Sequence, residues 1–177
     1  MAARQGDREA FAALVRSASD RLYAIAYRIL RDPDRAADAL QRALIAIWDD
    51  LPGLRDPDRF EAWATRLLVR TCYREAASER RQARVRSLHV VGSGHEFDMT
   101  GLIAERDRLE RGFRRLSPDH RAILVLRFYL DASVHEIART LGIPEGTAES
   151  RLHYALRSLR AELEADTRAA TAREAVS

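Results

Sequence analysis

The chain has 177 residues, which is enough for one ordinary domain or two small ones. Apolar residues make up 46% and charged residues 32%, a balance that excludes a disordered tail and indicates a soluble globular protein. All 30 basic residues are arginine, and the net charge is only +3. So small a net charge does not by itself indicate a nucleic-acid partner. The distribution of the charges along the chain is the more informative property.

Other composition features exclude several classes of protein. Cys72 is the single cysteine, so no internal disulfide can form, and no spacing of cysteine and histidine suggests a zinc site. Residues 1–9 are polar and charged, and no apolar run approaches the roughly 20 residues of a membrane span. We therefore expect a cytoplasmic protein that has no metal, no cofactor and no membrane insertion.

Almost every segment of the first half is predicted to be helical, because apolar residues recur at intervals of three and four. Two helix starts are marked by an aspartate cap followed by proline, at positions 32–33 and 56–57. The pattern predicts four helices, which cover residues 7–17, 20–30, 33–50 and 57–84. A short loop over residues 51–55 separates the last two.

A change of composition marks the boundary between two domains. Residues 87–105 contain no arginine, although arginine is about one residue in six elsewhere, and Gly92, Gly94 and Gly101 all fall there. This predicts a flexible, slightly acidic linker over residues 87–101. The expected fold class is all-α, with small helical domains over residues 1–86 and 102–165 and a frayed tail over residues 166–177. The arrangement of the two domains is left open.

The second half is predicted to contain a helix-turn-helix after two helices over residues 102–115 and 118–130. Ser133 and Glu136 have the spacing of a capping box, which begins a helix over residues 134–141. Gly142 supplies a left-handed residue that ends this helix, and Pro144 sets the start of the next, over residues 145–163. Two helices joined by a short glycine-containing turn are typical of a DNA-reading unit, although a helical corner that only packs has the same pattern.

The second helix of such a unit enters the major groove with its N-terminal residues first. Apolar residues recur at intervals of three and four along this helix, at Ala148, Leu152, Leu156 and Leu159, and would pack inward, which leaves a polar set to face DNA. The residues predicted to contact DNA are Thr147, Glu149, Ser150, Arg151 and Tyr154.

Positive charge is concentrated in one predicted helix of the first half. Residues 66–86 hold seven arginines and two acids, and four of the arginines are spaced by four or seven, which places them on one helix face: Arg66, Arg70, Arg74 and Arg81. Phe60, Trp63 and Leu67 lie on another face. Arginines beside exposed aromatic rings suit nucleic acid, whose phosphates take the charge and whose bases stack. The alternative is a solvated face neutralised by Glu75 and Glu79, but two acids cannot balance seven arginines.

Several short motifs follow one another along the chain. In the first half they are Glu9-Ala-Phe-Ala-Ala-Leu-Val, Arg21-Leu-Tyr-Ala-Ile-Ala-Tyr-Arg-Ile-Leu, Asp38-Ala-Leu-Gln41, and Arg59-Phe60 with Trp63. In the second half they are Leu116-Ser-Pro-Asp-His-Arg-Ala-Ile-Leu-Val-Leu-Arg-Phe-Tyr, Glu136-Ile-Ala, Leu141-Gly-Ile-Pro, and Gly146-Thr147 with Ser150-Arg151-Leu-His. In order and spacing, over about residues 7–163, they resemble a bacterial RNA polymerase sigma factor of the extracytoplasmic-function (ECF) subfamily of the sigma-70 family.

The resemblance implies a function and a set of contacts. A sigma factor directs the RNA polymerase core enzyme to specific promoters and helps to open them, and the polymerase performs the chemistry, so no catalytic residue is expected. The helix over residues 33–50 would bind the coiled coil of the β′ clamp through Asp38, Gln41, Arg42, Ile45 and Asp49. The loop and helix that follow would bind the minus-ten promoter element through Arg55, Asp56, Phe60, Trp63, Arg66, Arg70, Arg74 and Arg81.

The resemblance also implies roles for the rest of the chain. The helix-turn-helix would read the minus-thirty-five element, and the linker would thread toward the active-site and RNA-exit region of the polymerase. The β flap of the polymerase is a further expected partner. Factors of this type are often held by an anti-sigma protein, which makes such a protein another implied partner.

The chain departs from the family pattern in its charges. The family usually has Gln-Glu where this chain has Gln41 and Arg42, and a lysine in the recognition helix where it has Glu149. Its frequent Asn and Asp in the minus-ten helix are Arg70 and Arg74 here. A carboxylate repels phosphate but accepts a hydrogen bond from the N4 amine of cytosine. An altered promoter preference, rather than the loss of one, is therefore expected.

Two other functions fit parts of the same pattern. A polymerase-independent helix-turn-helix regulator would bind promoter DNA alone, and a helical protein-interaction module would not bind DNA at all. An enzyme fits poorly, because no carboxylate cluster, glycine-rich phosphate loop or nucleophile–base pair is present in the sequence.

Overall fold

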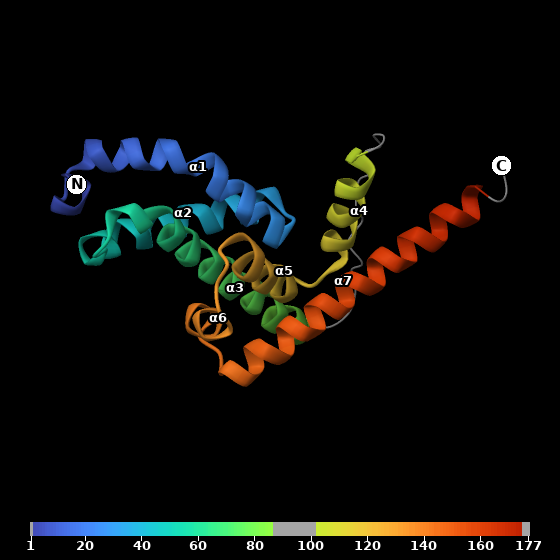
Figure 1. Cartoon of the computed structure of the whole chain (residues 1–177). Coiled ribbons are helices and arrows are strands. Elements are labelled where there is room, and N and C mark those ends of the chain that lie inside the picture. The colour runs from blue at the N-terminus through green and yellow to red at the C-terminus, as the bar shows by residue number, and fades with distance from the viewer. Residues whose placement is uncertain (1, 87–101, 175–177) are drawn as a thin grey trace.

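The computed structural model describes residues 2–86 and 102–174, and the linker predicted over residues 87–101 lies outside them. Every regular element in these two ranges is a helix, and the helices form two domains (Figure 1). The prediction of an all-α fold with two helical domains is therefore confirmed. No helix in the described ranges is both long and apolar enough to cross a membrane.

The first domain consists of α1 (Arg8–Leu30), α2 (Pro33–Asp50) and α3 (Phe60–Arg86), which pack against one another in pairs. A 3-10 turn, η1 (Ala2–Gln5), precedes them. Asp32 caps α2 by accepting a hydrogen bond from the Arg35 amide at 3.0 Å, as its place before Pro33 predicts.

The expectation of two helices over residues 7–17 and 20–30 is wrong, because α1 is continuous. The hydroxyl of Ser17 donates to the carbonyl of Leu14 at 2.8 Å, and that of Ser19 donates to the carbonyl of Val15 at 2.7 Å. Serine hydroxyls that bond back along a helix in this way need no break in the backbone. The cluster of polar residues at positions 17–20 is thus tolerated inside the helix.

Two short 3-10 turns connect α2 to α3, where the sequence predicts a loop and an immediate helix start. These are η2 (Leu51–Gly53) and η3 (Pro57–Arg59). Asp56 caps the second turn by accepting from the Asp58 amide at 3.1 Å. From Phe60 the chain continues as α3 to Arg86, two residues beyond the predicted end.

Complementary faces of the three helices form the core of the first domain. The inner face of α2 is made of Ala36, Ala39 and Ala43, all fully buried, and these small side chains let α1 and α3 approach it closely. Larger side chains, such as Ile29 and Leu68, fill the space around them and are also fully buried. Each buried side chain of that size contributes roughly 1.5–3 kcal/mol to stability.

The second domain consists of α4 (Leu102–Arg115), α5 (Pro118–Leu124), α6 (Val134–Leu141) and α7 (Glu145–Glu174). The predicted helix over residues 118–130 instead changes after Leu124 into a π-helical turn, η4 (Val125–Tyr129). Helix α7 extends to Glu174, into the stretch from residue 166 for which the sequence predicts a frayed tail. The alanine-rich composition of this stretch favours helix.

The helix-turn-helix has the local geometry that its sequence predicts. The Ser133 hydroxyl accepts from the Glu136 amide at 3.2 Å, and the Ser133 amide donates to the Glu136 carboxylate at 2.9 Å. This is the reciprocal capping box at the start of α6. Gly142 ends α6 in the left-handed conformation, with φ at +67°, which a side chain would strain.

Helix α4 packs against α7 at a point where Gly112 has no side chain. A Cβ at this position would lie 3.2 Å from Leu159 Cδ1 and 3.3 Å from Leu163 Cδ2, closer than ordinary van der Waals contact. Arg115 pairs with Glu162 at 3.0 Å beside it. The glycine therefore allows the close approach that joins α4 to the rest of the second domain.

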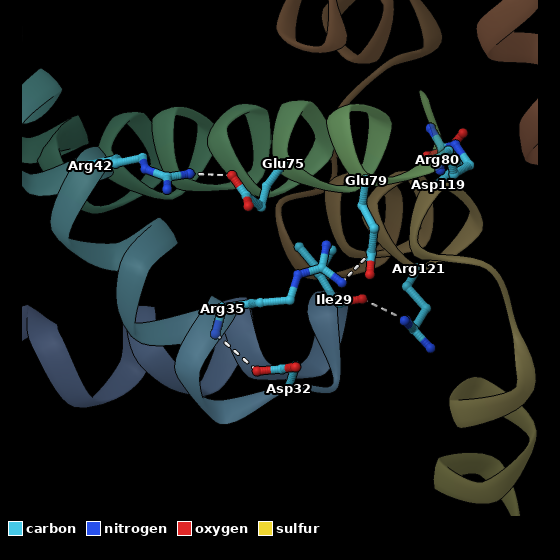
Figure 2. Close-up of polar contacts among 9 residues, drawn as sticks. All are labelled: Ile29, Asp32, Arg35, Arg42, Glu75, Glu79, Arg80, Asp119 and Arg121. Carbon is cyan, nitrogen blue, oxygen red and sulfur yellow. Dashed lines mark hydrogen bonds and ion pairs between the residues drawn. The ribbon is translucent and has the colours of Figure 1, made fainter. Parts of the chain in front are cut away.

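The two domains contact each other, with α3 against α5 and α6 and with α1 against α5 (Figure 1). At this junction Arg121 of α5 is only 5% exposed. Its Nε donates to the carbonyl of Ile29 at 2.7 Å, a contact drawn in Figure 2. Its Nη1 donates to the carbonyls of Arg114 and Leu116 at 2.9 Å each. One guanidinium thus joins the carboxyl ends of α1 and α4.

Ion pairs surround this buried arginine and also cross between the domains. Arg31 pairs with Glu110 at 2.8 Å, and Arg80 pairs with Asp119 at 2.6 Å. Burial, together with the nearby guanidiniums of Arg31 and Arg35, lowers the pKa of Arg121 to about 10. Arg121 is nevertheless charged at neutral pH.

Replacement of Ser133 by alanine is expected to destabilise the second domain by about 1 kcal/mol, because α6 loses the hydroxyl that caps its N-terminus. Chemical denaturation followed by circular dichroism measures the change. Ser17→Ala is the matched control, since that exposed hydroxyl bonds a carbonyl inside a helix and caps nothing. Equal stabilities of the two variants would contradict the capping role.

Replacement of Arg121 by methionine removes the guanidinium while keeping most of the side-chain volume. Each carbonyl that loses its donor costs about 1–3 kcal/mol, and the contact between α1 and α5 is expected to loosen. Small-angle X-ray scattering should show a larger radius of gyration, and denaturation a lower stability. Arg16→Met, at an exposed position of α1, should change neither quantity. An unchanged scattering profile for Arg121→Met would show that this residue does not hold the domains together.

Candidate nucleic-acid and protein interfaces

The N-terminal turns of α7 present the residues that the helix-turn-helix pattern predicts for DNA contact. Glu149 and Ser150 are exposed, and Tyr154 is 53% exposed, while Thr147 is half-buried. The opposite face holds Ala148 and Ala155, which are buried against the rest of the domain. The helix therefore has a packed side and a free side, as a recognition helix requires.

Arg151 differs from its neighbours, because it contacts the first domain. Its Nη1 donates to the hydroxyl of Tyr73 on α3, and its guanidinium lies 5.8 Å from the centre of that ring. Its Nη1 also lies 3.8 Å from the Asp119 carboxylate. In this arrangement Arg151 is half-buried between the domains rather than presented to a groove.

The arginines predicted to share one face of α3 occupy two environments. Arg70, Arg74 and Arg81 are exposed and have no ion-pair partner among the described residues. Arg66 is partly covered by α6 and lies 3.4 Å from the Glu136 carboxylate. We call these four residues the arginine ridge of α3.

The two acids within residues 66–86 do not neutralise the arginine ridge. Glu75 pairs with Arg42, and Glu79 pairs with Arg35, so both carboxylates reach across to α2 (Figure 2). The alternative interpretation, a solvated face balanced by Glu75 and Glu79, therefore does not describe α3. The ridge keeps its positive charge, which suits a phosphate backbone.

The aromatic residues at the start of α3 are less accessible than the sequence pattern suggests. Phe60 is only 7% exposed and belongs to the core, so the expectation of an exposed ring at this position is wrong. Trp63 is half-buried, with its ring centre 6.1 Å from that of Phe60. Arg55 and Asp56 lie on the exposed turn before Phe60.

One exposed face of α2 carries all five residues predicted to bind polymerase. Their spacing along the helix places Asp38, Gln41, Arg42, Ile45 and Asp49 on the same side. Ile45 is 63% exposed and stands as an apolar side chain among these polar ones. Arg42, the residue that departs from the family charge, is held by Glu75 and lies 4.0 Å from Asp38.

Sequence analysis missed an exposed aromatic pair in the second domain. Phe128 is 67% exposed and Tyr129 is 46% exposed, and both lie in the π-helical turn after α5. The continuous apolar run over residues 122–126 leads into them and hides the change of helix type. The positive φ of Asp131, at 48°, marks the end of this turn but has no clear sequence signal.

The described residues offer no metal site or reactive thiol. No group of three or more His, Cys, Asp or Glu side chains in the described ranges could hold a metal ion. Burial raises the pKa of Cys72 to about 12, so its side chain is a protonated thiol inside the core.

Two family models match the chain at the positions of the two domains. Sigma-70 region 2 matches residues 14–82, and Sigma-70, region 4 matches residues 112–161. Among solved structures, CnrH in complex with the cytosolic domain of CnrY is 27% identical, with a TM-score of 0.54, and the match covers 93% of this chain and 94% of that one. The sigma factor RpoE in complex with the anti-sigma factor NepR from Bartonella quintana has a TM-score of 0.62 at 21% identity, over 89% and 99%, and shows likeness of fold.

Relatives of similar length match nearly the whole chain. The RNA polymerase sigma-E factor of Streptomyces avermitilis is 33% identical over 154 residues, which cover 87% of this chain and 85% of that protein. The ECF RNA polymerase sigma factor SigL of Mycobacterium tuberculosis is 34% identical over 177 residues, which cover 93% and 97%. The chain belongs to the ECF subfamily of the sigma-70 family, and is an RNA polymerase sigma factor that directs transcription from specific promoters.

Proposed function

We propose that this sigma factor binds the polymerase core through α2, the minus-ten element through the arginine ridge of α3, and the minus-thirty-five element through the first turns of α7. The observation that carries the proposal is that three arginines of the ridge, Arg70, Arg74 and Arg81, have no ion-pair partner among the described residues, while the neighbouring acids are both bound to α2. The linker over residues 87–101 would join a domain over residues 1–86 to a domain over residues 102–165.

The exposed face of α2 has the composition of a protein-binding surface. An apolar side chain, Ile45, is surrounded by polar groups such as Gln41 and Asp49. Interfaces commonly combine a central apolar contact with a polar rim, and the central residue supplies most of the binding energy. We assign this face to the coiled coil of the β′ clamp, with Asp38 and Arg42 at its rim.

The minus-ten surface is proposed to run from the turn at Arg55 and Asp56 along the exposed side of α3. Arg70, Arg74 and Arg81 would contact phosphates, and an unstacked base would stack on the half-buried ring of Trp63. Phe60 would not touch the DNA itself. Its buried ring packs against Trp63 and would hold that side chain in position. Arg66 would have to leave Glu136 to join this surface.

The minus-thirty-five surface is proposed to consist of the exposed side chains at the start of α7: Thr147, Glu149, Ser150, Arg151 and Tyr154. Arg151 can reach DNA only after it leaves Tyr73 and Asp119 on the other side of the domain junction. We infer that the two domains move apart when the promoter is bound.

Further partners follow from the same assignment. The β flap is the proposed partner of the second domain, where Phe128 and Tyr129 offer exposed aromatic rings. A similar sigma factor, RpoE, was solved with an anti-sigma factor, and we propose a partner of that kind here. The protein would act in the cytoplasm as a binding factor without enzymatic activity of its own. Co-purification with core polymerase, followed by transcription from a genomic promoter library, tests the whole assignment, and the absence of any start site would reject it.

Truncation of Ile45 to alanine is expected to weaken binding to core polymerase by about ten-fold or more, because a central apolar contact is removed. Fluorescence anisotropy of the labelled chain, titrated with core enzyme, measures the change. Leu109→Ala, which truncates an exposed leucine on α4, is the matched control and should bind normally. If the two variants bound core polymerase with equal affinity, the proposal that α2 contacts the polymerase through Ile45 would be rejected.

Replacement of Glu149 by lysine is expected to change base preference at one position of the minus-thirty-five element from cytosine toward guanine. A carboxylate accepts from cytosine N4, whereas an ammonium donates to guanine O6 and N7. Transcription of a promoter library with core enzyme and each variant measures the preference. Asp20→Lys makes the same charge change at an exposed position of α1 and should leave the base preference unchanged. An unchanged preference for Glu149→Lys would show that this residue does not read a base.

A further inference from the structure

A cleft of about 360 Å³ lies between α3 of the first domain and α6 of the second. Trp63, Arg66, Leu67 and Arg70 line one wall, and Glu136, Arg139 and Thr140 line the other. Its volume lies within the range of roughly 300–1,000 Å³ that small-molecule sites occupy. Neither domain alone forms it, because each supplies one wall.

The charges in the cleft are unequal. Three guanidiniums face one carboxylate, and that carboxylate, Glu136, is bound to Arg66 at 3.4 Å. Arg70 and Arg139 are exposed and have no ion-pair partner among the described residues. Two unpaired guanidiniums on opposite walls are a ready site for an anion with several oxygens, since each can bind two oxygens through its planar fork.

The carboxylate in the cleft is held in place by the fold. Both the amide and the hydroxyl of Ser133 bond Glu136 Oε2, at 2.9 and 3.1 Å, as part of the capping box. These bonds lower the pKa of Glu136, so the side chain stays charged. Its other oxygen, Oε1, has only the long contact to Arg66 and keeps capacity to accept from a ligand N–H.

The cleft also has an apolar and aromatic part. Trp63 and Leu67 lie on the α3 wall one helical turn apart, and Thr140 belongs to the α6 wall. An indole beside guanidiniums accepts a planar base on its face and phosphates on the cations. A purely inorganic anion would use the arginines and leave this part of the cleft empty.

We propose that this cleft binds a nucleoside phosphate, with the base against Trp63 and the phosphates between Arg70 and Arg139. The ligand contacts both walls, so it favours the arrangement in which the two domains are in contact. The inference depends on the proposed function in one respect, because Arg66 and Arg70 are also assigned to the minus-ten surface. A bound nucleotide and promoter DNA would therefore compete for these two arginines.

Calorimetric titration of the full chain with GDP tests the site. Saturable binding is expected, with guanosine and inorganic pyrophosphate each about ten-fold weaker or more, because each supplies half of the contacts. Arg139→Gln removes a wall cation that has no assigned role in promoter binding, and GDP should bind it about ten-fold more weakly or worse. Arg16→Gln makes the same change on an exposed part of α1 and should bind GDP as the unmodified chain does.

Several outcomes would overturn the proposal. These are the absence of saturable GDP binding up to millimolar concentration, equal GDP affinity in the Arg139→Gln variant, and pyrophosphate binding as tight as that of GDP. A short single-stranded oligonucleotide that needs Arg139 when GDP does not bind would identify the cleft as a DNA surface instead.

Binding of the chain to core polymerase and to promoter DNA, measured without nucleotides, separates this proposal from the function proposed above. A chain that binds core and promoter but not GDP rejects the cleft alone. A chain that binds GDP in an Arg139-dependent manner but not core polymerase supports the cleft and rejects the assignment of α2.

Discussion

The arrangement of the two domains depends on the buried guanidinium of Arg121. Helices end with carbonyls that have no partner inside the helix, and a buried helix end needs a donor from elsewhere. Arg121 supplies donors to the ends of α1 and α4 together, through three carbonyl bonds of 2.7–2.9 Å. A positive charge also suits the negative end of each helix dipole. The cost of burying the cation is thus offset by groups that would otherwise be unsatisfied, and the junction forms where two helix ends meet.

The same junction is crowded with positive charge. Arg31 and Arg35 lie near enough to Arg121 to lower its pKa, and one buried nitrogen of Arg35, Nη2, has no partner among the described residues. Glu79 and Glu110 offset part of this charge. A polar junction with incomplete compensation is the kind that separates more readily than an apolar one. Because Arg151 and Arg66 also lie between the domains, the contact between the domains uses two side chains that we propose for promoter binding.

Local rules could be read from the sequence, and long-range ones could not. The caps at Asp32 and Ser133 and the left-handed Gly142 follow from residue type and spacing within one turn, so they were predictable. The exposed face of α2 follows from helical periodicity alone. The continuity of α1 and the burial of Phe60 depend on how the three helices of the first domain pack against one another. The ion pairs of Glu75 and Glu79 are made with arginines of α2, more than thirty residues away in the sequence. The periodicity of one helix predicts which of its faces is buried, but not which side chains of other helices contact it.

The pair of Arg42 with Glu75 shows how one such contact alters two surfaces. A pair this exposed contributes at most about 1 kcal/mol to stability, so its effect lies in where it places charge. On α2 it neutralises an arginine at a position where the family usually has glutamate, which reduces repulsion of a cationic partner. On α3 it withdraws a carboxylate that would otherwise offset the arginine ridge. The pair therefore makes the surface of α2 that we propose for polymerase less positive than its sequence suggests, and the surface of α3 that we propose for DNA more positive. A change of charge that looks unfavourable for the first proposed contact thus favours the second.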